Sequence, residues 1–109
     1  MKHLKLSPTL IQQHLRTLNK PGTPPWQLIT TPTSQHISVH YQLPTFKTTW
    51  KFLNQIADHS HKLKHHPTIT TTYNQVDLKL TTHDSGNYIT DLDIQLAKEI
   101  QQEYQQYKQ

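Results

Sequence analysis

The chain of 109 residues has no cysteine, only two glycines, and few aromatic residues, which make up 8% of the sequence. Without cysteine there is no disulfide, no thiolate metal site and no cysteine nucleophile, and a reducing compartment is compatible with the composition. The apolar runs are no longer than two or three residues, which excludes a membrane span, and the start MKHLKLSPTL lacks the apolar region of a secretory signal. These absences predict a cytoplasmic protein, with the nucleus as the other permitted location.

Hydrophobic residues are also scarce, at 32% of the chain, whereas threonine and glutamine together fill 29 positions. The length fits a single domain over residues 1–109 and excludes a two-domain cofactor enzyme. Because so thin a core favours further burial between subunits, we expect a homodimer or homotetramer. The net charge of +4 comes from scattered lysines and one arginine, Arg16, so we expect no direct binding of nucleic acid.

The spacing of apolar residues predicts the elements of the first half of the chain. Ser7 and Pro8 are typical of an N-cap and a first turn, which predicts a short helix over roughly residues 8–18. Prolines end this helix, and two short strands follow, the second from His36 to Leu43. A main helix is predicted from about residue 46 to 64, because apolar residues recur there at spacings of three and four. Its expected apolar face consists of Phe46, Trp50, Leu53, Ile56, Ala57, Ser60 and Leu63.

The second half of the chain predicts a β-hairpin and a last helix. Pro67 ends the main helix and begins the hairpin, whose turn is expected at Asn74-Gln75. Thr90 and Asp93 form an approximate capping box for a helix that ends near Tyr107. The order α-β-β-α-β-β-α predicts a single α+β domain. Its four-stranded antiparallel sheet is expected to carry helices packed on one face, with the other face solvated.

Histidine is abundant, with nine residues, five of them between His59 and His83. His65 and His66 stand where the main helix ends, and His83 stands where the second strand of the hairpin ends. Because a hairpin returns to its starting point, it is expected to bring these three imidazoles together at one cleft. With an unperturbed pKa of about 6.5, one imidazole can be protonated while its neighbour is neutral. Such a pair suits the removal of a proton and the protonation of a leaving hydroxyl, which together constitute a dehydration.

Two other interpretations of these histidines stay open. One is that they are surface or helix-terminal residues, which the helix dipole favours when they are charged. The other is a zinc site, because His61 and His65 are spaced i, i+4, and His66 or His83 would complete it. The missing glutamate of an HExxH helix and the absence of cysteine argue against zinc.

A spaced motif carries a resemblance to a known family. An HHP triplet is followed by an aromatic residue, then a second histidine, then an aspartate, here His65, His66, Pro67, Tyr73, His83 and Asp93. On these residues the segment HKLKHHPTITTTYNQVDLKLTTHDSGNYITDLDIQLA resembles the pterin-4a-carbinolamine dehydratase family. The family's other name records a second role, as the dimerisation cofactor of a homeodomain transcription factor. The similarity extends over about residues 41–103, and more weakly to Trp26.

The resemblance implies the fold predicted above, in members that pair their sheets into dimers and often pack helices into tetramers. It also implies an activity, the elimination of water from a 4a-hydroxytetrahydropterin to give a quinonoid dihydropterin for recycling. No metal and no organic cofactor would be needed. His65 and His83 would be the acid–base pair, and His66 would hold the pterin and contribute to proton transfer.

Three further residues are expected at the substrate site. Trp26 would either stack on the flat pterin or fill the core, and the resemblance favours stacking. Asp93 would cap its helix and, as in the family, lie beside the site. His61 stands where many members carry an acidic residue, which changes the charge around its neighbours. Leu92 stands where an arginine is common, and the loop after His83 is one residue longer.

An alternative function comes from a different class. The chain would then be a non-catalytic interaction protein that uses the same fold and contacts a protein partner through the main helix. Retention of all three histidines argues against this alternative, because a partner-binding helix requires neither an HHP corner nor a distant histidine.

Overall fold

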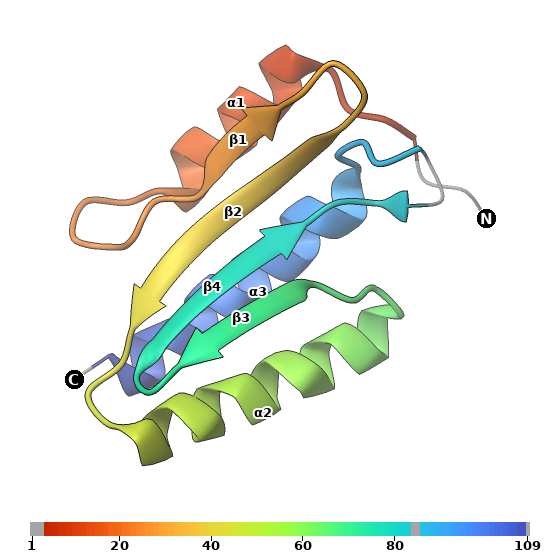
Figure 1. Ribbon diagram of the computed structural model, residues 1–109. Helices are drawn as coiled ribbons and strands as arrows, with labels where there is room; N and C mark the ends of the chain where they lie inside the picture. The colour runs from red at the N-terminus through yellow and green to blue at the C-terminus, as the bar shows by residue number, and fades with distance from the viewer. Residues whose placement is uncertain (1–3, 84–85, 109) are drawn as a thin grey trace.

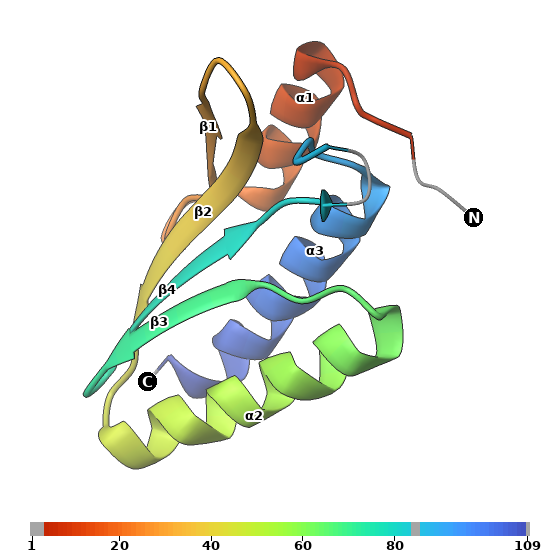
Figure 2. The same cartoon turned by 45° about the vertical axis from the view of Figure 1, so that its right-hand side comes forward.

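The computed structural model describes residues 4–83 and 86–108, and its elements follow in the predicted order. The strands form one antiparallel sheet in the order β1-β2-β4-β3. All three helices cover the same face of this sheet (Figure 1, Figure 2). The predicted α+β class is therefore confirmed. The elements are α1 (Pro8–Leu18), β1 (Gln27–Thr30), β2 (Gln35–Gln42), α2 (Phe46–Leu63), β3 (Thr68–Thr72), β4 (Gln75–Leu80) and α3 (Asp91–Tyr107).

The core lies between the sheet and the helices, because apolar and polar residues alternate along the central strands. The outward positions are polar, as in the exposed pair of His40 and Asp77. Within the described ranges, no helix combines the length and the apolar character needed to cross a membrane. The inward positions of β2 and β4 face one another in buried pairs, Ile37 with Leu80, Val39 with Leu78, and Tyr41 with Val76.

The helix starts are formed by the predicted caps. The Ser7 side chain accepts a hydrogen bond from the Leu10 backbone N–H at 3.2 Å, and Pro8 occupies the first turn of α1. At α3 the capping box is complete, because Asp93 Oδ2 accepts from the Thr90 backbone N–H at 2.9 Å. These caps satisfy backbone donors that the first turn of a helix leaves without partners. The position of the α3 start is therefore determined by Thr90 and Asp93.

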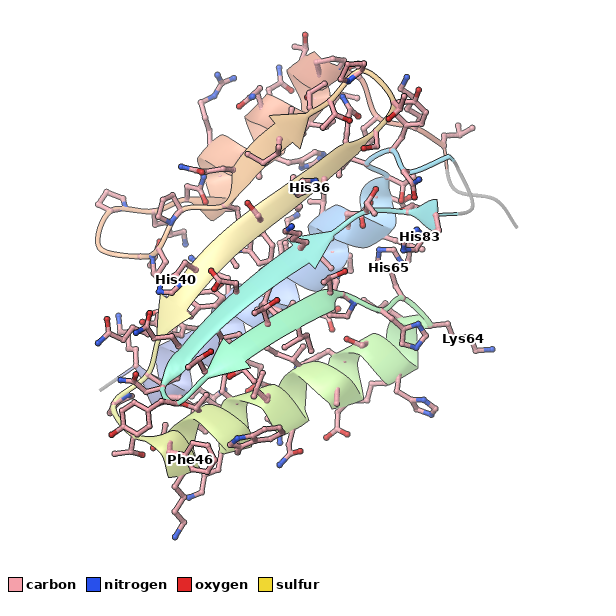
Figure 3. The ribbon with its side chains drawn as sticks, in the orientation of Figure 1. His36, His40, Phe46, Lys64, His65 and His83 are labelled. Carbon is pink, nitrogen blue, oxygen red and sulfur yellow. The ribbon has the colours of Figure 1, made fainter. Side chains whose placement is uncertain are left out.

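The predicted apolar face of α2 is partly wrong. Phe46 and Trp50 are 54% and 45% exposed, and their rings contact each other at a centroid distance of 6.4 Å. Phe46 points away from the sheet at the start of the helix (Figure 3). Ala57 is exposed as well, whereas Leu53, Ile56 and Ser60 are buried as predicted. The buried stripe includes two residues outside the predicted face and keeps the three-to-four residue spacing of a buried face. Its buried members are Thr49, Phe52, Leu53, Ile56 and Ser60.

The hairpin turn also differs from the prediction. Thr72 pairs with Gln75, so the two turn residues are Tyr73 and Asn74, one position earlier than expected. Tyr73 has a φ of 52°, in the left-handed region that residues with a β-carbon seldom adopt. Asn74 supports the turn, because its Nδ2 donates to the Leu43 carbonyl at 2.9 Å. This bond ties the hairpin to the end of β2.

Candidate active site

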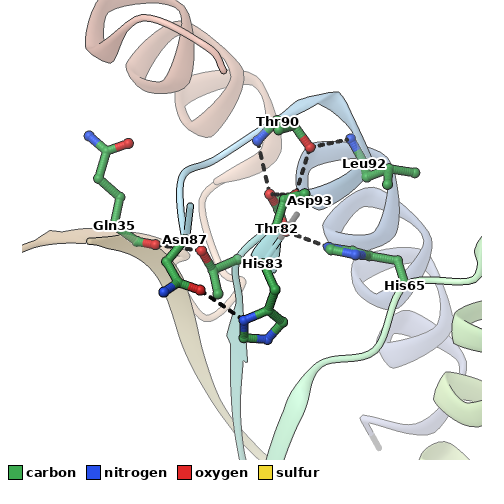
Figure 4. A network of polar contacts seen from close by, with 9 residues as sticks. Gln35, His65, Thr82, His83, Asn87, Thr90, Leu92 and Asp93 are labelled. Atoms are coloured by element: carbon green, nitrogen blue, oxygen red, sulfur yellow. Dashed lines mark hydrogen bonds and ion pairs between the residues drawn. The ribbon is translucent and has the colours of Figure 1, made fainter. Parts of the chain in front are cut away.

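The first candidate residue, His65, is positioned by the way α2 ends. Lys64 takes the left-handed conformation with a φ of 53°, and the His65 backbone N–H then donates to the Ser60 carbonyl at 3.1 Å. This reversal directs the His65 side chain inward, where the residue is 7% exposed. Its Nε2 lies 2.5 Å from Asp93 Oδ1 (Figure 4). Within the described part of the chain, Nδ1 of the same ring has no hydrogen-bond partner.

Asp93 is fully buried, and both of its carboxylate oxygens are occupied. Oδ1 meets His65, whereas Oδ2 accepts from the Thr82 hydroxyl at 2.7 Å and from the Thr90 backbone N–H. The Thr82 and Thr90 hydroxyls also lie 2.7 Å apart. An ionised carboxylate only accepts hydrogen bonds, so Nε2 of His65 is the donor. Asp93 therefore caps α3 and orients His65 at the same time, the two readings that the sequence allowed.

His83 follows the last strand and is exposed. Its Nδ1 donates to Asn87 Oδ1 at 2.8 Å. Two hydrogen bonds fix the backbone of Asn87: its N–H donates to the Thr82 carbonyl, and its carbonyl accepts from the Gln35 backbone N–H. Asn87 adopts a φ of 65°, in the left-handed region. The bond to Asn87 leaves Nε2 of His83 without a partner among the described residues. A ligand at this edge would meet that nitrogen.

His65 and His83 lie at the same edge of the molecule (Figure 3, Figure 4). Asp93 links them, because it binds both His65 and Thr82, the residue directly before His83. β3 begins at Thr68, opposite Lys79, so the chain from Leu80 to His83 has no β3 neighbour on that flank. His66 is exposed beside His65 in the segment that leads into β3. The structure therefore brings the three histidines to one open end of the sheet.

The other two predicted substrate-binding residues lie differently. His61 is exposed on the last turn of α2. Trp26 is 1% exposed, stands next to the opposite edge strand β1, and meets the Tyr41 ring edge-on at 6.4 Å. Asn19 holds the Trp26 backbone by two hydrogen bonds of 2.8 Å. Trp26 therefore fills the core, which was the alternative to stacking on a pterin in the sequence analysis.

The arrangement needed for the zinc alternative is not formed by these residues. α2 ends at Leu63, so His65 is not one helical turn along the same face from His61. His61 faces solvent, whereas His65 turns inward to Asp93. Over residues 4–83 and 86–108, no group of three or more His, Asp or Glu side chains has a spacing suited to a metal ion.

Two residues of the site were missed by the sequence interpretation, Thr82 as a partner of Asp93 and Asn87 as a partner of His83. A signal for Thr82 existed in the strand alternation, which continues inward from Leu78 and Leu80 to Thr82. Asn87 had no comparable signal, because its contact depends on the path of the loop.

Comparison with known proteins places most of the chain in one family. Residues 4–103 match the family described as pterin 4 alpha carbinolamine dehydratase. The chain belongs to this family. The resemblance carried by the HHP motif, the second histidine and the aspartate is thereby confirmed.

Individual relatives cover most of the chain. A protein of Rhizobium rhizogenes named "Putative pterin-4-alpha-carbinolamine dehydratase" is 37% identical over 101 residues, which are 93% of this chain and 92% of the relative. A protein of Bordetella avium with the same name is 37% identical over 75 residues, 69% of this chain and 67% of the relative. The solved structure of a transcriptional coactivator/pterin dehydratase from Brucella melitensis is 29% identical. It superposes with a TM-score of 0.79 and covers 92% of this chain and 98% of that one.

Proposed function

We propose that this protein is a dehydratase that eliminates water from a 4a-hydroxytetrahydropterin and yields the quinonoid dihydropterin. The observation that carries the proposal is the pair of His65 and His83 at one open edge. Each of these rings uses one nitrogen to bond to the protein and leaves the other nitrogen for a ligand. Membership of the family supports the choice of substrate class.

The elimination needs one base and one acid. The base removes the proton on N5 of the pterin, the electrons of that N–H bond form the C4a–N5 double bond, and the C4a–O bond breaks. The acid protonates the departing hydroxyl, which leaves as water, so the reaction is redox-neutral. General acid–base groups of this kind typically contribute about 10² to 10⁴ in rate.

The two histidines have different hydrogen-bond partners, and this difference supports a division of roles. Nδ1 of His65 takes the proton from N5, because the Asp93 carboxylate behind the ring stabilises the imidazolium that forms. His83, exposed at the edge, is the acid and donates from Nε2 to the hydroxyl. His66 lies beside them, holds the pterin and contributes to proton transfer. Asp93 is a positioning residue, since it acts through His65.

A second candidate function is the binding of a protein partner through α2. It is favoured by the exposed Phe46–Trp50 pair, which is not part of the hydrophobic core cluster of the described chain. It also agrees with the description of the Brucella melitensis relative as a transcriptional coactivator. The same surface suits a further copy of the chain, in the homodimer or homotetramer that a thin core favours.

The decisive experiment follows the dehydration of a freshly generated 4a-hydroxytetrahydropterin by stopped-flow absorbance. We expect acceleration by the wild-type protein and a loss of about 10²-fold in His83→Ala, with His40→Ala as a matched control at an exposed histidine outside the site. Trp50→Ala keeps the rate but would abolish binding of an α2 partner. Absence of acceleration by folded wild-type protein would overturn the dehydratase proposal, and an unchanged rate in His83→Ala would overturn its site.

A further inference from the structure

A cavity lies away from the histidine edge, between the turn that follows α1 and the C-terminal half of α3. Its volume is about 530 Å³, within the range of roughly 300–1,000 Å³ typical of small-molecule sites. Gln102, in its wall, is nine residues beyond Asp93 on α3, about 14 Å along the helix axis. No histidine stands among the lining residues of this cavity in the described structure. The residues of its wall on which the inference rests are Leu18, Lys20, Pro21, Lys98, Gln101 and Lys108.

The charged side chains of this wall are all cationic. Lys20, Lys98 and Lys108 line the cavity together, and no carboxylate stands among the lining residues. Among the described residues, none of the three ammonium groups takes part in an ion pair. Like charges that share a cavity repel one another, so a bound anion would lower the electrostatic energy of this region.

Helix dipoles explain only part of this cluster. Lys20 and Lys108 lie at the C-terminal ends of α1 and α3, where the dipole favours a cation. Lys98 lies in the middle of α3 and is half-buried, so no helix end accounts for it. Lys98 is therefore the residue that most specifically marks the cavity as a site for an anion.

Gln101 also stands in the wall of this cavity. It is 7% exposed, and the Tyr41 hydroxyl donates to its Oε1. Its Nε2 is buried and has no hydrogen-bond partner in the described structure. Because this nitrogen is buried from solvent, the lysines and not Gln101 supply the polar contacts that a ligand in the cavity would make.

We propose that this cavity binds an organic phosphate, a small molecule with at least two negatively charged phosphate oxygens. Lysine ammonium groups are common phosphate ligands, and three separated cations fit a ligand with more than one negative charge. The volume exceeds what a lone phosphate fills, and the apolar side chains of Leu18 and Pro21 provide contact for an uncharged body. The inference is independent of the dehydratase reaction.

The test is an NMR titration of the full chain with ATP, with inorganic pyrophosphate and citrate as separate arms. With ATP we expect saturable shifts of the Lys20, Lys98 and Gln101 signals, and none at His65 or His83. ATP is expected to bind more tightly than pyrophosphate, and citrate more weakly than both. Shifts confined to the histidine edge would overturn the proposal. Equal binding of ATP and pyrophosphate, or binding of citrate as tight as that of ATP, would overturn the ligand class.

Variants locate the binding. Lys98→Gln is expected to weaken ATP binding by about tenfold, because it removes one charge-assisted contact and keeps the helix propensity. Lys20→Gln, in the exposed turn, provides a second measurement that does not depend on a residue within a helix. Lys62→Gln, on exposed α2, is the matched control and should change the affinity less than about twofold. Wild-type affinity in both cavity variants would show that the anion binds elsewhere.

Discussion

Two histidine–carboxylate clusters of this protein use the same chemical groups in different ways. At the open edge, His65 bonds to Asp93 through Nε2 and keeps Nδ1 for a ligand. Between α2 and α3, His59 lies with Nδ1 2.6 Å from Glu99 Oε1 and Nε2 2.9 Å from Glu103 Oε1. A ring that donates from both nitrogens is an imidazolium, and it has no nitrogen left for a substrate. The two clusters therefore differ in how many ring nitrogens bond to carboxylates: one in His65, the residue proposed to react, and two in His59.

The surroundings of His59 agree with this assignment. Partial burial disfavours its charged form, but the hydrogen bonds to Glu103 and Glu99 outweigh burial and raise its pKa above the ordinary 6.5. Because the two glutamates are on α3 and His59 is on α2, the cluster holds two helices together. The His59 cluster thus joins two helices, whereas the His65 cluster is the one that we propose takes part in the reaction.

The largest effect is expected from Asp93→Ala. The substitution removes the acceptor of His65, of the Thr82 hydroxyl and of the Thr90 backbone N–H at once. We expect the free energy of unfolding to fall by about 3–5 kcal/mol. Urea denaturation measures it, with Asp93→Asn as the shape-preserving variant that loses less. If Asp93→Ala unfolds at the wild-type urea concentration, the buried cluster is not formed in solution.

His65→Gln tests the reactive side of the comparison. A glutamine amide still donates to Asp93, so the fold is largely kept, but it has no basic nitrogen to take the pterin proton. We expect kcat for dehydration to fall about 10²-fold, which corresponds to about 2.7 kcal/mol in the barrier. Stopped-flow kinetics checks this loss, and a wild-type kcat would rule out His65 as the base.

His59→Gln makes the same exchange in the His59 cluster. A neutral glutamine amide, which donates from a single nitrogen, replaces a charged ring that donates from two, so the contact of His59 with Glu99 or with Glu103 is lost. We expect the free energy of unfolding at pH 6 to fall by about 1–2 kcal/mol, with kcat unchanged. The opposite pattern, a lower kcat with full stability, would contradict the division between the clusters.

The contribution of His59 to the free energy of unfolding should also depend on pH, in a direction set by its raised pKa. A raised pKa means that the folded state holds the proton more tightly, so the stabilisation is complete below about pH 6.5 and fades as the pH rises through the folded pKa. The stability difference between wild type and His59→Gln is therefore expected to shrink from pH 6 to pH 9. Urea denaturation at each pH measures it, and a difference that grows over this interval would contradict the imidazolium.

The smallest effect is expected for the third histidine–carboxylate pair, His40 with Asp77. Its nitrogen–oxygen distance is 2.8 Å, but the two side chains are 50% and 56% exposed. Solvent screens such a pair, so His40→Ala should change the free energy of unfolding by less than about 0.5 kcal/mol. Thermal or urea denaturation at pH 6 provides the comparison with His59→Gln, and a larger loss would mean that exposure does not weaken the pair.

Much of the fold was predictable because its signals are local. Ser7 with Pro8 marks the start of α1, and Thr90 with Asp93 marks that of α3, since each cap needs only neighbouring residues. The orientation of α2 was not predictable in the same way. Phe46 and Trp50 keep helical spacing with the core residues, and periodicity alone does not tell which of two adjacent apolar stripes faces the sheet.

The three histidines and Asp93 could be named from the sequence as candidates, but the hydrogen bonds that hold them could not, and Trp26 lies in the core instead. His65 and Asp93 are separated by 28 positions, and their contact depends on the left-handed Lys64 and on the start of α3. The Tyr73 turn shows the same limit, because a non-glycine residue in the left-handed region contradicts local preference. Tertiary contacts determine such positions.

The double use of Asp93 has a consequence for how the protein acquires its site. The carboxylate that starts α3 also holds His65, so the orientation of His65 depends on the presence of α3. During synthesis, a chain that has emerged only as far as His83, just beyond β4, contains all three histidines but not Asp93, which orients the first of them. The arrangement proposed as the site is thus completed only by α3, and a chain truncated before α3 would carry the motif without it.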